Sequence, residues 1–173
     1  MKRIITATVQ DRSGVLNRVT GLLQRRQFNI ESISVGPSET EGISKMTLVV
    51  EVEDEQRLEQ VTKQLNKQID VLKVSDITDK AIVARELALI KVASSSQLRS
   101  EIHGIIDPFR ALIIDVSKDS LAVQITGRPD KIDALIEMLR PYGIKEIART
   151  GLTALQRGHQ PQGSDLATYS LLK

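Results

Sequence analysis

Residues whose types and spacing suggest chemistry gather near the start of the chain, in the run Asp11-Arg12-Ser13-Gly14-Val15-Leu16. This polar turn separates a β-rich stretch from the apolar stripe of a helix, and Gly14 falls at the start of that helix. The first backbone N–H groups of a helix lack partners within it and carry a partial positive charge, so they can hold a carboxylate. Asp11 and Asn29 can hold an ammonium group nearby. A carboxylate and an ammonium close together describe a free amino acid, so the sequence predicts a small-molecule sensor.

Each of these residues also has an ordinary structural role. Gly14 suits any turn from strand to helix, Asp11 suits a turn in which it bonds its own backbone, and Asn29 suits a bend at the start of a strand. The three together favour a binding site. The two histidines, His103 on a polar helix position and His159 in a polar stretch, predict no metal site, because no Cys accompanies them.

Composition excludes several classes of protein. The 173 residues carry 24 basic and 22 acidic side chains, so no strong field attracts nucleic acid or an anionic membrane. The absence of Cys excludes disulfides, thiolate nucleophiles and iron–sulfur clusters, and fits a reducing compartment. No apolar run approaches the roughly 18 residues of a membrane span, and no signal-peptide core follows Met1, which predicts a cytoplasmic protein. Aromatic residues are scarce, so an aliphatic core is expected.

The first half of the chain predicts the order βαββαβ. Strands are expected over 3–9, 28–36, 43–52 and 71–77. Helices are expected to begin after the N-cap residues Ser13 and Asp54. The buried stripe of the first helix is formed by Val15, Leu16, Val19, Leu22 and Leu23, and that of the second by Leu58, Val61 and Leu65. This order is that of a ferredoxin-like unit.

The second half repeats the order. Strands are expected over 85–92, 112–116, 121–126 and 144–148, and apolar stripes predict helices that end at Pro108 and begin at Pro129. The fold class is therefore α+β, with two ferredoxin-like units in tandem. The predicted domains are 1–78 and 84–157, joined by a linker at 79–83 and followed by a flexible tail at 158–173. Because helices cover only one face of each sheet, dimerisation is expected.

Several segments in both units resemble one known family. They are RSGVLNRV (12–19), FNIESISV (28–35), KQLNK (63–67), DVLKV (70–74), RELALIKV (85–92), FRA (109–111) with DV (115–116), and KEIARTG (145–151). The first unit resembles the ACT domain, an amino-acid-sensing module with an Asp/Asn-x-x-Gly-x-Leu turn after its first strand. The chain to about Gly158 resembles the small, regulatory subunit of acetolactate synthase, also called acetohydroxyacid synthase.

The resemblance implies that the chain has no active site and no cofactor of its own. Family members bind a catalytic large subunit that uses thiamine diphosphate, Mg²⁺ and FAD. They raise its activity and confer feedback inhibition by valine in the biosynthesis of valine, leucine and isoleucine. They form homodimers, with effector sites where two ACT domains pair.

Carried over to this sequence, the effector site would combine residues from both chains of the dimer. Asp11, Gly14, Val15 and Leu16 of one chain would face Asn29 and Ile30 of the other, with Val35 among the apolar neighbours of the effector side chain. Many relatives have Asn where this chain has Asp11. An Asp would strengthen ammonium binding and repel a misplaced carboxylate.

The sequence supports three other functions less well. A sensor that acts on a transcription factor or an unrelated enzyme shares the same site and differs only in its partner. Catalysis as in small ferredoxin-like phosphatases requires an Arg-bearing phosphate loop, and the turn at 11–16 lacks the Gly-rich cradle of such a loop. RNA-recognition modules share the order βαββαβ but stack bases on strand aromatics, and the corresponding strands here carry Ile, Val, Met and Leu.

Overall fold

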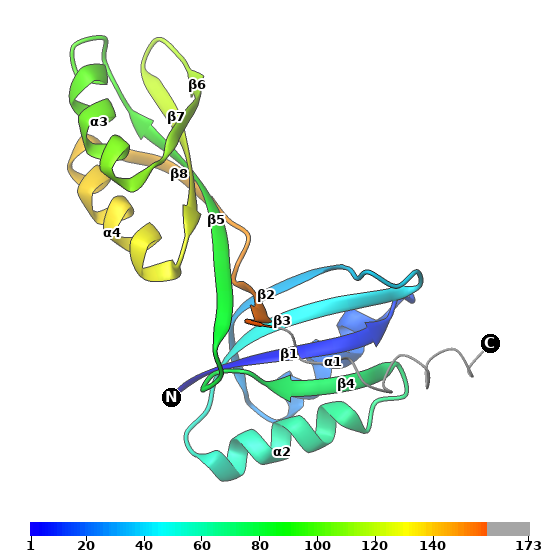
Figure 1. Ribbon diagram of the computed structural model, residues 1–173. Coiled ribbons are helices and arrows are strands. Elements are labelled where there is room, and N and C mark those ends of the chain that lie inside the picture. Colours follow the sequence, from blue (N-terminus) through cyan, green and yellow to red (C-terminus); the bar gives the residue numbers. More distant parts are fainter. Residues whose placement is uncertain (159–173) are drawn as a thin grey trace.

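The structure is a computed structural model, and it describes residues 1–158. It contains two units connected by one long strand, β5 (Ile82–Ala93), which begins beside the first unit and ends inside the second (Figure 1). The predicted flexible tail, 158–173, and with it His159, lies outside the described residues except for Gly158.

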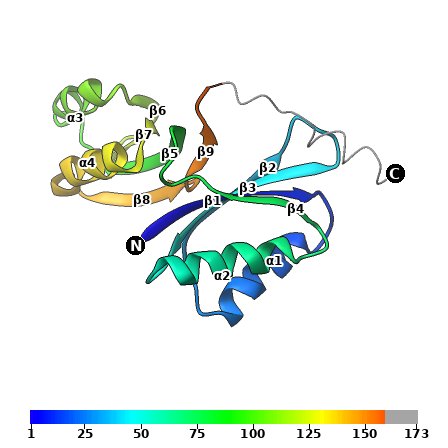
Figure 2. The same ribbon diagram turned by 60° about the horizontal axis from the view of Figure 1, so that its bottom comes forward.

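The first unit is an antiparallel sheet with two helices on one face (Figure 2). The strands are ordered β2-β3-β1-β4, so β2 and β4 are the edges. The elements are β1 (Lys2–Gln10), α1 (Val15–Arg25), β2 (Asn29–Pro37), β3 (Ile43–Glu51), α2 (Glu55–Asn66) and β4 (Val71–Asp76). The predicted ferredoxin-like order is confirmed.

Alternation along the strands explains which face meets the helices. In β1, Ile5, Ala7 and Val9 point toward the helices and are almost fully buried, because successive side chains of a strand point to opposite faces. Val19 and Leu23 of α1 complete this aliphatic core.

The two helix starts of this unit differ. At α2 the Asp54 carboxylate accepts a hydrogen bond from the Arg57 N–H at 2.7 Å, which confirms the predicted cap. At α1 the predicted Ser13 cap is wrong, because the residue before the helix is Gly14, with φ +82°, and no side chain caps the helix. The predicted burial of Leu16 is also wrong, since its side chain is 45% exposed.

The second unit repeats the arrangement, and its prediction is confirmed too. Its antiparallel sheet has the order β6-β7-β5-β8, and Pro129 begins α4 as expected. Besides β5, its elements are α3 (Arg99–Ile106), a short 3₁₀ turn (Asp107–Phe109), β6 (Leu112–Val116), β7 (Ser120–Gly127), α4 (Pro129–Leu139), a second 3₁₀ turn (Arg140–Tyr142) and β8 (Ile144–Arg149).

A short strand that the sequence did not predict, β9 (Thr153–Gln156), pairs antiparallel with the start of β5, from Ile82 to Arg85. Residues 82 and 83 therefore belong to a strand, although they were expected in the linker. The Ala154 N–H donates to the Thr47 hydroxyl at 3.4 Å, on the face of the first sheet that lies away from its helices. The two-stranded ribbon of β5 and β9 thus covers part of that face, and Thr47 is buried.

Candidate functional site

The turn between β1 and α1 is held by backbone hydrogen bonds. The Asp11 N–H donates to the Gly42 carbonyl at 2.8 Å, which ties the turn to the β2–β3 hairpin. The Val15 N–H donates to the Arg12 carbonyl at 3.3 Å, and the Val15 side chain is buried in the core. The Leu16 and Asn17 amides that follow have no acceptor within the helix, and the Arg18 N–H is the first to donate back, to the Gly14 carbonyl at 3.0 Å.

The first turn of α1 contains no acidic residue that could compensate the positive end of the helix dipole. The helix dipole therefore leaves a partial positive charge at the exposed Gly14 turn. This arrangement suits a carboxylate group, and the exposed Leu16 lies beside it with an apolar side chain. The predicted residues Asp11, Gly14, Val15 and Leu16 thus share one turn.

The sequence reasoning missed a guanidinium group at this turn. Arg18 Nη2 forms an ion pair with Asp70 Oδ2 at 2.5 Å, and the Asp70 side chain is buried. Arg18 Nη1 lies 3.1 Å from the place that a Cβ at Gly14 would occupy. The spacing of four between Gly14 and Arg18 puts both on one helix face and was a usable signal. The distant Asp70, which orients the guanidinium, left no such signal.

The remaining predicted residues lie along β2. Ile30 packs against the core of the first unit, and Val35 is 44% exposed on the same side of the sheet, opposite Met46. The Asn29 side chain donates to Glu51 Oε2 at 3.3 Å. Within the described residues β2 pairs only with β3, so its other edge is open.

A single chain does not bring Asn29 to Gly14. The Gly14 turn follows the end of β1 that lies near Pro37, as the pairs Gln10–Ile43 and Pro37–Ser44 show. Asn29 pairs with Glu51 at the opposite end of the sheet. The eight-residue separation along β2 corresponds to roughly 26 Å at the usual rise per strand residue.

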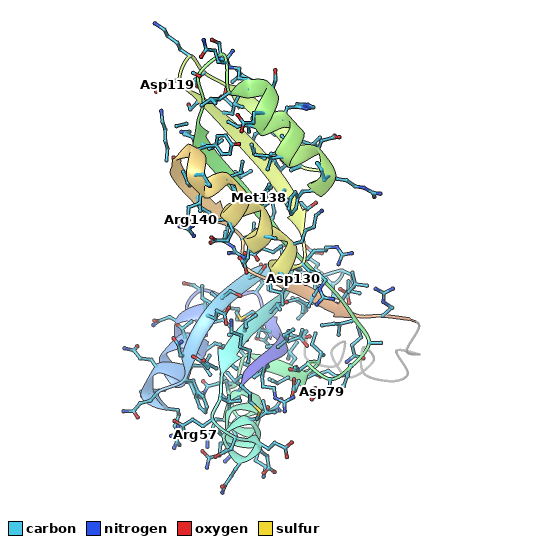
Figure 3. The ribbon with its side chains drawn as sticks, turned by 90° about the vertical axis from the view of Figure 1, so that its left-hand side faces the viewer. Arg57, Asp79, Asp119, Asp130, Met138 and Arg140 are labelled. Carbon is cyan, nitrogen blue, oxygen red and sulfur yellow. The ribbon has the colours of Figure 1, made fainter. Side chains whose placement is uncertain are left out.

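A cleft of about 670 Å³ lies between the two units. Residues 30–33 of β2 and Lys2 line it from the first unit. Three segments line it from the second unit, and they contribute Glu86 of β5, Pro129 and Asp133 of α4, and Arg149–Leu152. The first turn of α4, where Asp130 is labelled, lies at this junction (Figure 3).

An ion pair between the partly exposed Arg149 and the buried carboxylate of Glu86 lies at the wall of this cleft. Arg149 donates through Nε and Nη2 to the two oxygens of Glu86, at 2.7 and 2.8 Å, and through Nη1 to Asp133 at 2.7 Å. The hydrogen bonds from Arg149 to Glu86 raise the pKa of the Arg149 guanidinium further above its already high ordinary value. Arg149 therefore stays charged and holds the end of β8 in place.

Within residues 1–158 no group of three or more His, Asp and Glu side chains is placed to hold a metal ion. In the same part of the chain, no helix is long and apolar enough to cross a membrane.

Comparison with known proteins assigns both units. Residues 5–73 match the AHAS small subunit-like ACT domain, and residues 85–158 match the small subunit of acetolactate synthase. The chain is 64% identical over 172 residues to the acetolactate synthase small subunit of Bacillus subtilis, covering 99% of this chain and 100% of that protein. The chain belongs to the acetolactate synthase small subunit family.

Further relatives support this membership over most of the chain. The probable acetolactate synthase small subunit of Methanothermobacter thermautotrophicus is 55% identical over 156 residues, covering 90% of this chain and 92% of that protein. The crystal structure of the small subunit from Thermotoga maritima has a TM-score of 0.84 at 38% identity, covering 92% and 99% of the two chains. The small subunit is the regulatory, non-catalytic part of the enzyme, and it implies a catalytic large subunit as its partner.

Proposed function

We propose that this chain activates the catalytic large subunit of acetolactate synthase and confers feedback inhibition by valine on it. The observation that carries the proposal is the exposed start of α1, which has no cap and no acid and lies under the Arg18 guanidinium, in an ACT domain. Such a site suits the carboxylate of an amino acid. Thiamine diphosphate, Mg²⁺ and FAD belong to the large subunit, and this chain needs no cofactor. The cytoplasmic location stays a prediction.

Valine would bind by all three of its groups. Its carboxylate accepts N–H bonds from the Gly14 turn and faces the Arg18 guanidinium, where charge-assisted bonds are strong. Asp11 or the partner's Asn29 holds its ammonium group. The isopropyl group rests on Leu16 and Val35 of this chain and on the partner's Ile30. Because one methylene is worth only about 1–3 kcal/mol, leucine and isoleucine are expected to bind more weakly rather than not at all.

A homodimer formed through β2 would complete this site. The open edge of β2 supplies unpaired backbone groups, and two copies can pair antiparallel about a centre near Ile33. Such pairing puts the partner's Asn29 beside Pro37 of this chain, close to the Gly14 turn. The separation of about 26 Å within one chain then becomes proximity across the dimer.

The experiment measures acetolactate formation by the cognate large subunit, alone, with this chain, and with valine titrated into the mixture. Stimulation that valine reverses supports the whole proposal. Stimulation without any valine response keeps the partner and rejects the effector site. If a pull-down shows that the two subunits assemble and there is still no stimulation, the activating role is rejected.

A further inference from the structure

Strand β2 contacts different parts of the molecule on its two faces. The face toward the helices carries Ile30 and Val35, which belong to the proposed effector site. The opposite face carries Ser32 and Ser34, which pair in register with Val49 and Thr47 of β3. Both serines contact the segment that leads out of the second unit after β8.

These contacts are direct hydrogen bonds. The hydroxyls of Ser34 and Thr153 lie 2.8 Å apart, and the Leu152 N–H donates to the Ser32 hydroxyl at 3.4 Å. The β2–β3 pairing shifts register between Ile30 and Ser32, so a bulge adjoins the contact. A bulge is a place where a strand can bend without breaking its whole ladder.

Gly151 makes this close approach possible. Its φ is +76°, which glycine adopts readily and other residues rarely do. A Cβ at this position would lie 3.1 Å from the Ser32 Cβ and 3.5 Å from the Ile33 carbonyl oxygen. Two residues earlier, Arg149 is fixed to Glu86 and Asp133 of the second unit. The segment 149–153 is therefore anchored to the second unit at one end and to β2 at the other.

We propose that the segment 149–153 transmits effector occupancy from β2 to the second unit, with Gly151 and Ser32 as its positioning residues. The inference rests on the proposed function, because the effector site supplies the signal. An effector that shifts or stiffens β2 from one face moves Ser32 and Ser34 on the other. The second unit then changes its position across the cleft, since residues 30–33 and 149–152 line opposite walls. Such coupling requires contacts whose strength differs between the effector-bound and effector-free states. The hydrogen bonds between the Ser32 and Ser34 hydroxyls and residues 152 and 153 are these contacts.

The test is Gly151→Ala in the holoenzyme, assayed for acetolactate formation with and without valine. We expect activation without valine to match the wild type, and the largest inhibition that saturating valine produces to fall at least about threefold. Valine affinity, measured by calorimetry on the free dimer, is expected to stay within about twofold of the wild type, because no proposed effector contact is touched. A merely structural role for Gly151 would lower the melting temperature and leave the maximal inhibition unchanged.

The matched control is Gly158→Ala, where φ is +87° but no atom lies within 4 Å of the added Cβ. It imposes similar backbone strain without the contact to β2, so its valine response should remain that of the wild type.

The outcomes separate the two proposals. A wild-type holoenzyme that ignores valine rejects the proposed function. A wild type that responds, together with a Gly151→Ala variant that responds equally, rejects the transmission alone. If Gly151→Ala does not fold, the double variant Ser34→Ala, Thr153→Val decides, because it removes the 2.8 Å hydroxyl contact without adding volume. Unchanged maximal inhibition in that variant overturns the inference, and reduced inhibition supports it.

Discussion

The two units share one topology, and they differ at the start of their first helices, α1 and α3. In each unit, the residue after the first strand donates its N–H to the hairpin opposite. Asp11 donates to the Gly42 carbonyl at 2.8 Å, and Ser94 donates to the Asp119 carbonyl at 3.0 Å. The same chain path therefore delivers both turns to the same place at the end of a sheet.

The charges at the two turns differ. The start of α1 has no acid in its first turn, and the Arg18 guanidinium lies over Gly14. The first turn of α3 contains Glu101, and the Arg99 guanidinium donates a hydrogen bond to the Ser117 carbonyl at 2.6 Å. Of the two turns, only that of α1 combines the absence of an acid with a guanidinium beside its glycine. A repeated fold does not repeat a site, because the site depends on a few side chains that the fold leaves free to vary.

The largest expected effect is that of Gly14→Asp, which should remove valine inhibition and leave activation intact. The left-handed backbone at φ +82° disfavours any side chain there by about 1–2 kcal/mol, and the new carboxylate meets Arg18 where the effector carboxylate would bind. The half-inhibitory valine concentration is expected to rise at least about 100-fold, or ~2.7 kcal/mol. Gly104→Asp adds the same charge to α3 in open space and should change nothing. A normal valine response from Gly14→Asp would contradict the carboxylate site.

A smaller effect is expected for Arg18→Gln, which tests the charge that distinguishes the two turns. Loss of one charge-assisted contact should weaken valine binding about tenfold, or ~1.4 kcal/mol, as measured by calorimetry. The variant should also be about 1–3 kcal/mol less stable to urea, because the buried Asp70 loses its partner. Arg99→Gln is the counterpart in the second unit. Equal valine affinities in the two variants would show that Arg18 only holds α1 to Asp70, the residue before β4.

The smallest effect concerns a feature that both units share, a lysine that pairs with a carboxylate at each hairpin. Hydrogen bonds from Lys45 lower the pKa of Glu39, and those from Lys145 lower the pKa of Asp119. A carboxyl whose pKa is lowered by folding stabilises the fold above its unfolded pKa, and this contribution is lost as pH falls through the lowered value.

The replacements Lys45→Met and Lys145→Met should therefore each raise the paired carboxyl pKa back toward its ordinary value, as followed by NMR titration. Neither should change the valine response. A changed response in Lys145→Met alone would place an effector contact at the second turn and break the contrast between the units.

Local patterns in the sequence determined most of the architecture. Alternation in β1 and the stripe of α1 predict which residues are buried, because strand and helix periodicities are properties of the backbone itself. The repeated order βαββαβ, the Asp54 cap and the Pro129 helix start follow from residues close together in the chain. The Asp11–Leu16 turn also belongs to this class, since all its members are neighbours.

Only the tertiary structure decided the contacts between distant residues. Arg18 and Asp70 are 52 positions apart, and β9 pairs with a part of β5 that was expected to be linker. No local period marks such partners, because their pairing depends on how whole elements pack. The same holds for Gly14, whose left-handed backbone displaced the expected Ser13 cap, and for Asn29, which lies at the far end of the sheet from the turn. Sequence neighbours and residue types identified the candidate site. The packing of β2, with the helix-side core on one face and residues 152 and 153 on the other, decided which other parts of the molecule that site can contact.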